Sequence, residues 1–129
     1  MMTMNPAIFS TVAKQDYLHL FDGEQPKCQD VMRFLEFKKQ DVARAVGVPL
    51  ASVRWDVRMP AEVKERFREW ANLLNLVAEF FEGNVQKTVL WVTLPNPMLG
   101  NVSPRDMISF GRYKRLSKFI ANALSENRR

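Results

Sequence analysis

Apolar residues recur at intervals of three and four along most of the chain, which is the spacing of one face of an α-helix. The longest such run follows Pro60 and consists of Val63, Phe67, Trp70, Leu74, Val77 and Phe81. Leu73, Leu76 and Phe80 widen this apolar face. Because the stripe is wider than a coiled-coil seam, it predicts a central core helix that ends at Gly83-Asn84.

Shorter helices are predicted on both sides of this element from periodicity and from residues that start or stop helices. They cover, in order, residues 29–35, 39–46, 50–55, 85–93, 104–110 and 112–124. Gly47 is expected to end the second of them. Ser103 is expected to cap the fifth, with Pro104 in its first position and Asp106 in the place of a capping-box acid.

No segment is predicted to form a strand, so the fold class is all-α, a compact helical domain. Residues 1–26 lack sustained periodicity and are expected to form a partly ordered N-terminal arm. Residues 27–59 have the pattern of a helix-turn-helix-like unit. Residues 60–129 are predicted to form the long central helix and a C-terminal helical region.

Composition narrows the functional classes. The chain has 129 residues, 47% of them hydrophobic, but no apolar run approaches the roughly 18 residues of a membrane span. We therefore expect a cytoplasmic protein that does not bind membranes. A single Cys28 and a single His19 offer neither an intramolecular disulfide nor a zinc site, and a Ser or Cys nucleophile would lack a nearby base. We expect no enzymatic activity, no metal and no cofactor.

The positive charge is concentrated at the C-terminus. The net charge is +5, and residues 103–129, with seven Lys or Arg against two Asp or Glu, account for all of it. Such a segment suits an anionic partner, although a solvated basic face has the same composition.

Residues 38–58 have the spacing of a helix-turn-helix. Ala43 would lie where the two helices touch, Gly47 in the turn, and Val53 would anchor the second helix. On this interpretation the second helix presents base-reading side chains, while basic residues meet phosphates. The candidate DNA-binding residues are Lys38, Lys39, Arg44, Ser52, Arg54, Trp55 and Arg58.

The same small and apolar residues also fit a tri-helical packing unit without any DNA function. Asp56 adds negative charge at the reading edge, and Pro60 shortens the second helix. DNA binding and a purely structural role both remain open from these residues alone.

Residues 90–108 combine a helix, a turn with two prolines and a second, capped helix. The segment contains Trp91, Pro95-Asn96, Leu99-Gly100, Ser103-Pro104 and Asp106-Met107-Ile108, and Gly111 and an amphipathic helix follow it. In residue types and spacing it resembles the toxin-binding domain of the Xre/MbcA/ParS antitoxins. The resemblance covers roughly residues 60–124, and the helix-turn-helix-like unit lies where that family carries one.

The resemblance implies an antitoxin of a type II toxin–antitoxin system that covers the active site of a RES-domain toxin, an enzyme that depletes NAD. It also implies self-pairing, a hetero-oligomer with the toxin, and repression of its own operon through operator DNA. The alternative is a stand-alone DNA-binding regulator without a toxin. The candidate toxin-binding residues are Asn96, Leu99, Gly100, Arg105, Arg112, Tyr113, Arg115, Arg128 and Arg129.

Overall fold

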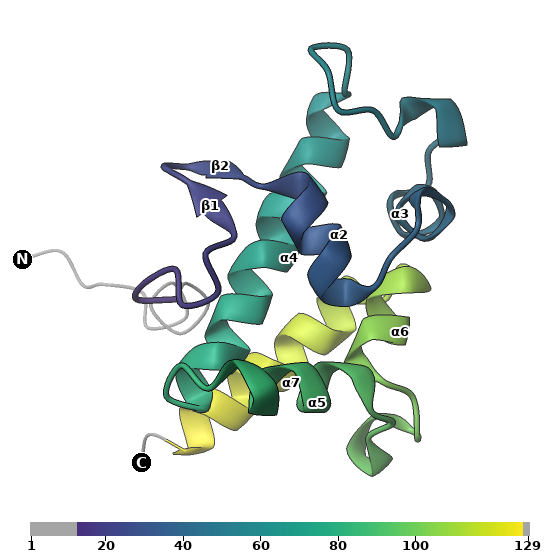
Figure 1. Ribbon diagram of the computed structural model, residues 1–129. Coiled ribbons are helices and arrows are strands. Elements are labelled where there is room, and N and C mark those ends of the chain that lie inside the picture. Colours follow the sequence, from purple (N-terminus) through teal and green to yellow (C-terminus); the bar gives the residue numbers. More distant parts are fainter. Residues whose placement is uncertain (1–12, 128–129) are drawn as a thin grey trace, which may run out of the picture.

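The computed structural model describes residues 13–127, which form a mostly helical domain with one very small sheet (Figure 1). The all-α class predicted from periodicity is confirmed. None of the described helices is long and apolar enough to cross a membrane. The helices are α2 (Cys28–Leu35), α3 (Lys39–Val46), α4 (Ala61–Phe80), α5 (Val85–Thr93), α6 (Pro104–Ser109) and α7 (Tyr113–Asn127), with 3-10 turns η1 (Leu50–Ser52) and η2 (Pro97–Leu99).

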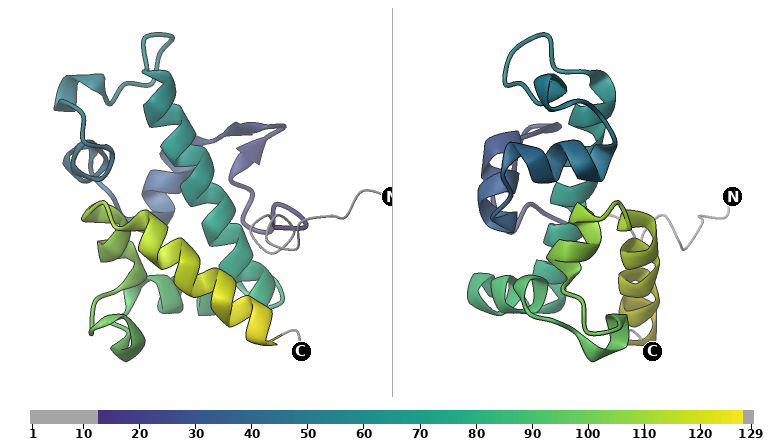
Figure 2. Two further views of the ribbon diagram at one scale, coloured as in Figure 1. Left: turned by 180° about the vertical axis from the view of Figure 1, so that it is seen from behind. Right: turned by 90° about the vertical axis from the view of Figure 1, so that its right-hand side faces the viewer.

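The long helix α4 is the centre of the domain. In the two opposite views α2 crosses one side of α4 and α7 crosses the other (Figures 1 and 2). The Phe67 ring packs edge-on against Trp70 with centroids 5.1 Å apart, and Phe37 packs against the same Trp70 at 5.8 Å. The predicted apolar face is buried except at its end, where Phe80 is 44% exposed and lies at the last residue of the helix.

Several predicted helix ends are confirmed by their hydrogen bonds. Gly47 ends α3 with φ 81° and donates its N–H to the Ala43 carbonyl. The Ser103 hydroxyl accepts the Asp106 N–H at 3.0 Å at the start of α6. The Asp106 carboxylate, expected to complete a capping box, instead lies 3.0 Å from the Arg105 guanidinium.

The prediction that the chain contains no strand is wrong. β1 (Phe21–Asp22) pairs antiparallel with β2 (Gln25–Pro26), and Phe21 lies opposite Pro26. Gly23 turns the chain between them with φ 63°. Strands of two residues contain no alternation that a sequence pattern can show.

Residues 13–26, expected to be a partly ordered arm, are bonded to α4. The Ala13 N–H donates to the Asn72 side chain at 3.1 Å, and the Leu18 N–H donates to Asn75 Oδ1 at 2.9 Å. Leu20 is buried in the core. This part of the predicted arm therefore belongs to the folded domain, and residues 1–12 lie outside the described residues.

Asp16 fastens this segment to the buried Asn75. Its carboxylate accepts the Leu20 and Phe21 N–H groups at 2.8 and 2.9 Å and the Asn75 Nδ2 amide at 3.0 Å. Desolvation alone would raise the pKa of Asp16, but these hydrogen bonds and the nearby His19 outweigh it and lower the pKa below its ordinary value.

A lowered carboxyl pKa makes a pH-dependent contribution to stability. The contribution of Asp16 is present above its unfolded pKa, near 4, and is lost as the pH falls through the lower folded value. Asp16→Asn should therefore destabilise the domain by about 1–3 kcal/mol at pH 7 and by less near pH 3. Urea denaturation at both pH values tests this, and an equal loss at each pH would contradict it.

Candidate protein-binding site

The Pro-Asn-x-x-Leu-Gly segment between α5 and α6 folds into a closed loop. The Asn96 N–H donates to the Val102 carbonyl at 3.2 Å, and its side-chain oxygen accepts the Met98 N–H at 2.9 Å. Gly100 supplies the left-handed conformation, φ 72°, that ends η2. Because the loop is tied at its base, it holds Met98 outward, and Met98 is 76% exposed.

Beside this loop lies an apolar groove formed by the end of α4, by α5, by η2 and by the second half of α7. One part of it, about 230 Å³, is lined by Val77, Phe80, Phe81, Trp91, Asn96, Met98, Phe119, Ile120, Ala123 and Leu124. The other part, about 440 Å³, is lined by Phe81, Lys87, Leu90, Trp91, Leu94, Pro95, Asn96 and Pro97. Shared residues join the two parts into one surface, which we call the apolar groove.

Large apolar side chains reach solvent along the apolar groove. Leu90 is 56% exposed and Leu94 is 54% exposed, in addition to Phe80 and Met98. Single exposed apolar residues are ordinary, but a contiguous group marks a site of contact with another molecule. The elements that line the groove, the end of α4, α5 and the second half of α7, come together at the lower end of the domain in Figure 1.

The predicted toxin-binding residues do not form one site. Asn96 lines the apolar groove, whereas Leu99 packs on the core and Gly100 is exposed in the loop. Arg112 and Arg115 lie at the other end of α7 with Tyr113. Arg128 and Arg129 lie outside the described residues.

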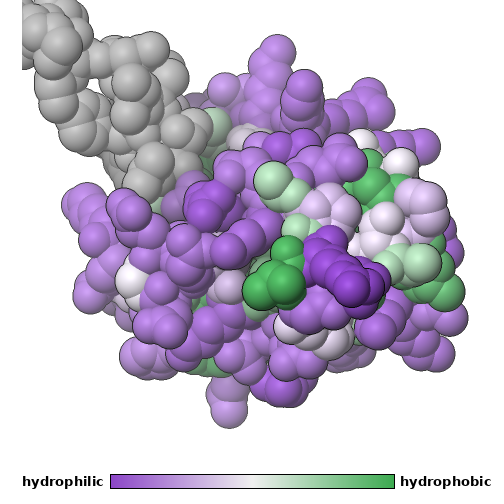
Figure 3. Space-filling model, turned by 90° about the horizontal axis from the view of Figure 1, so that it is seen from above, coloured by the Kyte–Doolittle hydropathy of each residue, from purple (hydrophilic) through white to green (hydrophobic). Residues whose placement is uncertain are grey.

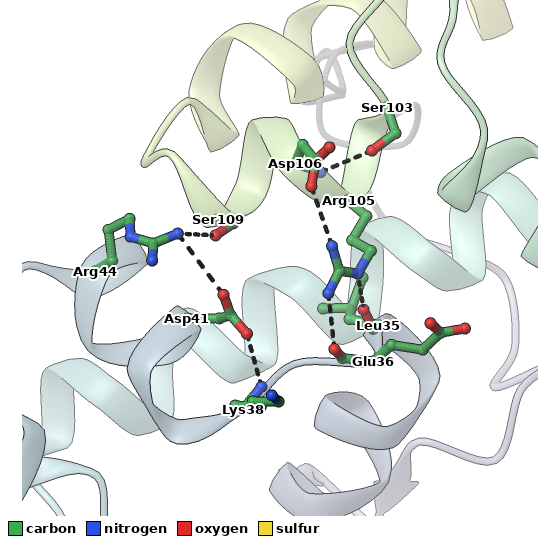
Figure 4. Close-up of polar contacts among 9 residues, drawn as sticks. All are labelled: Leu35, Glu36, Lys38, Asp41, Arg44, Ser103, Arg105, Asp106 and Ser109. Carbon is green, nitrogen blue, oxygen red and sulfur yellow. Dashed lines mark hydrogen bonds and ion pairs between the residues drawn. The ribbon is translucent and has the colours of Figure 1, made fainter.

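Arg105 is engaged within the chain, in contrast to the toxin-facing position predicted for it (Figure 4). Its Nε donates to the Leu35 carbonyl and its Nη2 to the Glu36 carbonyl at 2.8 Å. Its guanidinium also lies over the Phe37 ring, 5.5 Å from the centroid. Arg105 therefore satisfies carbonyls at the C-terminal end of α2 and fastens α6 to it.

Tyr113 also has an internal partner. Its hydroxyl donates to the Glu69 carbonyl at 3.3 Å. Burial, together with the negative charge of Glu69, raises the pKa of Tyr113 to about 12. The phenol is therefore neutral at physiological pH and fastens the start of α7 to α4.

The predicted reading helix is shorter than expected. Instead of a helix over 50–55, the structure has the 3-10 turn η1, which ends at Ser52. Val53 is buried as the expected anchor, but Arg54, Trp55 and Arg58 follow in the connection to α4. The predicted extent of this helix is wrong, and these side chains do not share a helical face.

Asp56 explains the local conformation of this connection. Its carboxylate accepts the Arg58 N–H at 2.9 Å and pairs with Arg54 Nη2 at 2.8 Å. Two hydrogen bonds lower the pKa of Asp56 below its ordinary value. The larger effect comes from the Arg54 side chain and the next from the Arg58 N–H. An Asp side chain that binds backbone two residues on favours a turn over a helix. Arg54 is thereby engaged in an ion pair.

Two of the other candidate DNA-binding residues, Arg44 and Lys39, contact the domain through their side chains. Arg44 Nη1 donates to the Ser109 hydroxyl at 3.0 Å and lies 3.7 Å from Asp41 (Figure 4). The Lys39 ammonium lies 5.9 Å from the centroid of the Trp55 ring, whereas Lys38 is bonded through its backbone N–H, which donates to the Asp41 carboxylate at 2.8 Å. The face of the molecule seen from above in Figure 3 is mostly hydrophilic, with small apolar areas. These contacts link α3 to α6 and to the connection that follows α3.

Three exposed apolar residues of the groove, Leu90, Leu94 and Met98, were missing from the residues predicted to bind a partner. Leu90 lies on α5 and Leu94 is the C-cap residue that follows it, four positions later, so their spacing fits an inward helical face equally well. The sequence signal near them is Pro95, which follows the C-cap Leu94 and stops the helix there.

Comparison of the chain with protein-family models, curated proteins and solved structures finds no match. The antitoxin resemblance therefore depends on the motif in residues 91–111 and its surroundings. Within residues 13–127, no three His, Cys, Asp or Glu side chains come together as a metal site requires.

Proposed function

We propose that this chain is an antitoxin that binds and neutralises a RES-domain, NAD-depleting toxin, with the apolar groove as the main contact surface. The observation that carries the proposal is the group of half-exposed large apolar residues along this groove. The motif that resembles the antitoxin family supplies the groove's Trp91, Asn96 and the loop that holds Met98 outward.

The composition of the groove suits a protein partner. Trp, Phe and Met are enriched at the centres of protein interfaces, and Lys is depleted there. Here Trp91, Phe80 and Met98 lie within the groove, and Lys87 lines its outer part. Burial of these side chains would supply hydrophobic free energy that a single exposed residue cannot.

The direct test mixes the purified chain with a purified RES-domain toxin, taken from the adjacent reading frame where one is encoded there. We expect a complex that survives gel filtration and an NAD-consuming activity that falls in proportion to the chain added. A folded, monodisperse chain that neither forms the complex nor slows NAD consumption would overturn the proposal.

Surface substitutions are better probes here than truncation. Leu116, Ile120 and Leu124 of α7 are buried, so removing α7 would expose the core against α4 as well as the groove. A truncated chain that failed to neutralise the toxin would then report unfolding, whereas a substitution at an exposed groove residue leaves the core intact.

A further inference from the structure

A second concave site lies at the opposite end of α7 from the apolar groove. It is a cleft of about 700 Å³ between the C-terminal end of α3, the middle of α4 and the junction of α6 with α7. Arg66, Arg112, Lys114 and Arg115 line it, together with a single carboxylate, Glu69. We call it the basic cleft.

The charge of the basic cleft is largely uncompensated. Arg66 Nε lies 2.8 Å from Glu69, so this pair is already neutral. Arg112, Lys114 and Arg115 are exposed, and no carboxylate of the described residues forms an ion pair with them. Three cations on one concave surface repel one another, and an anion between them would relieve that repulsion.

The N-terminus of α7 opens into the same cleft. Gly111, with φ 78°, turns the chain toward the helix, and Arg112, the residue before Tyr113, carries a guanidinium, which has only donors and cannot accept a helix N–H. By contrast, α5 and α6 are capped by Asn84 and Ser103. The helix dipole adds to the positive potential of the three cations.

We propose that the basic cleft binds a phosphorylated small molecule of about nucleotide size. Its phosphates would lie at the start of α7 between Arg112, Lys114 and Arg115. This inference does not depend on the proposed antitoxin function, because its residues are separate from the apolar groove.

Charge and shape both favour this ligand. An oligophosphate carries several negative charges on adjacent groups, which matches three cations and a helix N-terminus better than one carboxylate does. Ala45, Val46 and Ile108 form an apolar wall beside the cations, against which an organic group can pack. The volume lies within the range of small-molecule sites, about 300–1,000 Å³.

The test is calorimetric titration of the full chain with ATP, tripolyphosphate, adenosine and a hexaglutamate peptide in magnesium-free buffer. We expect saturable binding of ATP, weaker binding of tripolyphosphate and none of adenosine or of the peptide. Arg115→Glu should weaken ATP binding by about tenfold or more, because it replaces a charge-assisted contact by repulsion.

The matched control is Lys118→Glu, which makes the same charge change on the same helix at an exposed residue outside the cleft lining. It should change ATP affinity by less than about threefold, as expected for screened charges at a distance. Equal effects of the two variants, binding of the peptide but not of ATP, or no saturable binding of ATP would each overturn the proposal. Circular dichroism of both variants verifies that they are folded.

Discussion

Arg105→Ala is expected to lower the free energy of unfolding by about 2–4 kcal/mol, because it leaves two helix-end carbonyls without their charged donor. The carbonyls belong to Leu35 and Glu36, and the substitution also removes the contact with the Phe37 ring. Urea denaturation followed by circular dichroism measures this change. The loss should occur in the isolated chain, with no partner present.

The matched control for this prediction is Arg115→Ala, an exposed arginine without an ion pair among the described residues. It should change stability by less than about 0.5 kcal/mol. Arg105→Lys should recover only part of the loss, since one ammonium cannot reproduce the fork that reaches two carbonyls. A fully stable Arg105→Ala variant would show that this side chain is free for a partner after all.

Under the proposed antitoxin function, placing charge in the apolar groove should weaken toxin binding strongly. The double substitution Leu90→Asp and Leu94→Asp should weaken affinity for the RES-domain toxin by about 100-fold or more, because two carboxylates would be desolvated against an apolar surface. Both side chains are more than half exposed, so the isolated chain should remain folded. Affinity is measured by titration with catalytically inactive toxin.

The control double variant is Leu50→Asp with Val57→Asp. These residues are 50% and 102% exposed in and after η1, and they do not line the groove. The variant makes the same change in charge and hydrophobicity and should bind the toxin normally. Comparable losses in the two double variants would contradict the placement of the interface.

Elements set by local interactions were predictable from the sequence. The bounds of α3 and α5 follow from a short apolar face and an adjacent stop, Gly47 in one case and Pro95 in the other. Ser103 and Pro104 start α6 for similarly local reasons. Periodicity and caps act within a few residues, so one segment contains the information that decides them.

Two kinds of feature were not predictable: local conformations in which a turn competes with a helix, and side-chain positions that depend on contacts distant in the sequence. The segment after η1 has helical spacing, but Asp56 binds the backbone and Arg54 and stabilises a turn instead. Arg105 looks like a surface residue, whereas its partners lie 69 and 70 positions earlier in the chain. The exposure of Leu90 likewise depends on where α4 and α7 lie relative to α5. These outcomes depend on tertiary packing, which no local window contains.

We propose that this chain neutralises a RES-domain toxin through the apolar groove. Co-expression with a RES-domain toxin in a bacterial host tests this proposal. The toxin is expressed with the wild-type chain, with the Leu90→Asp/Leu94→Asp variant or with the Leu50→Asp/Val57→Asp variant, and growth and cellular NAD are followed. The wild type and the Leu50/Val57 variant should restore both, and the groove variant, soluble and equally abundant, should restore neither. Loss of NAD and growth with the wild-type chain, or full rescue by the groove variant, would contradict the claim.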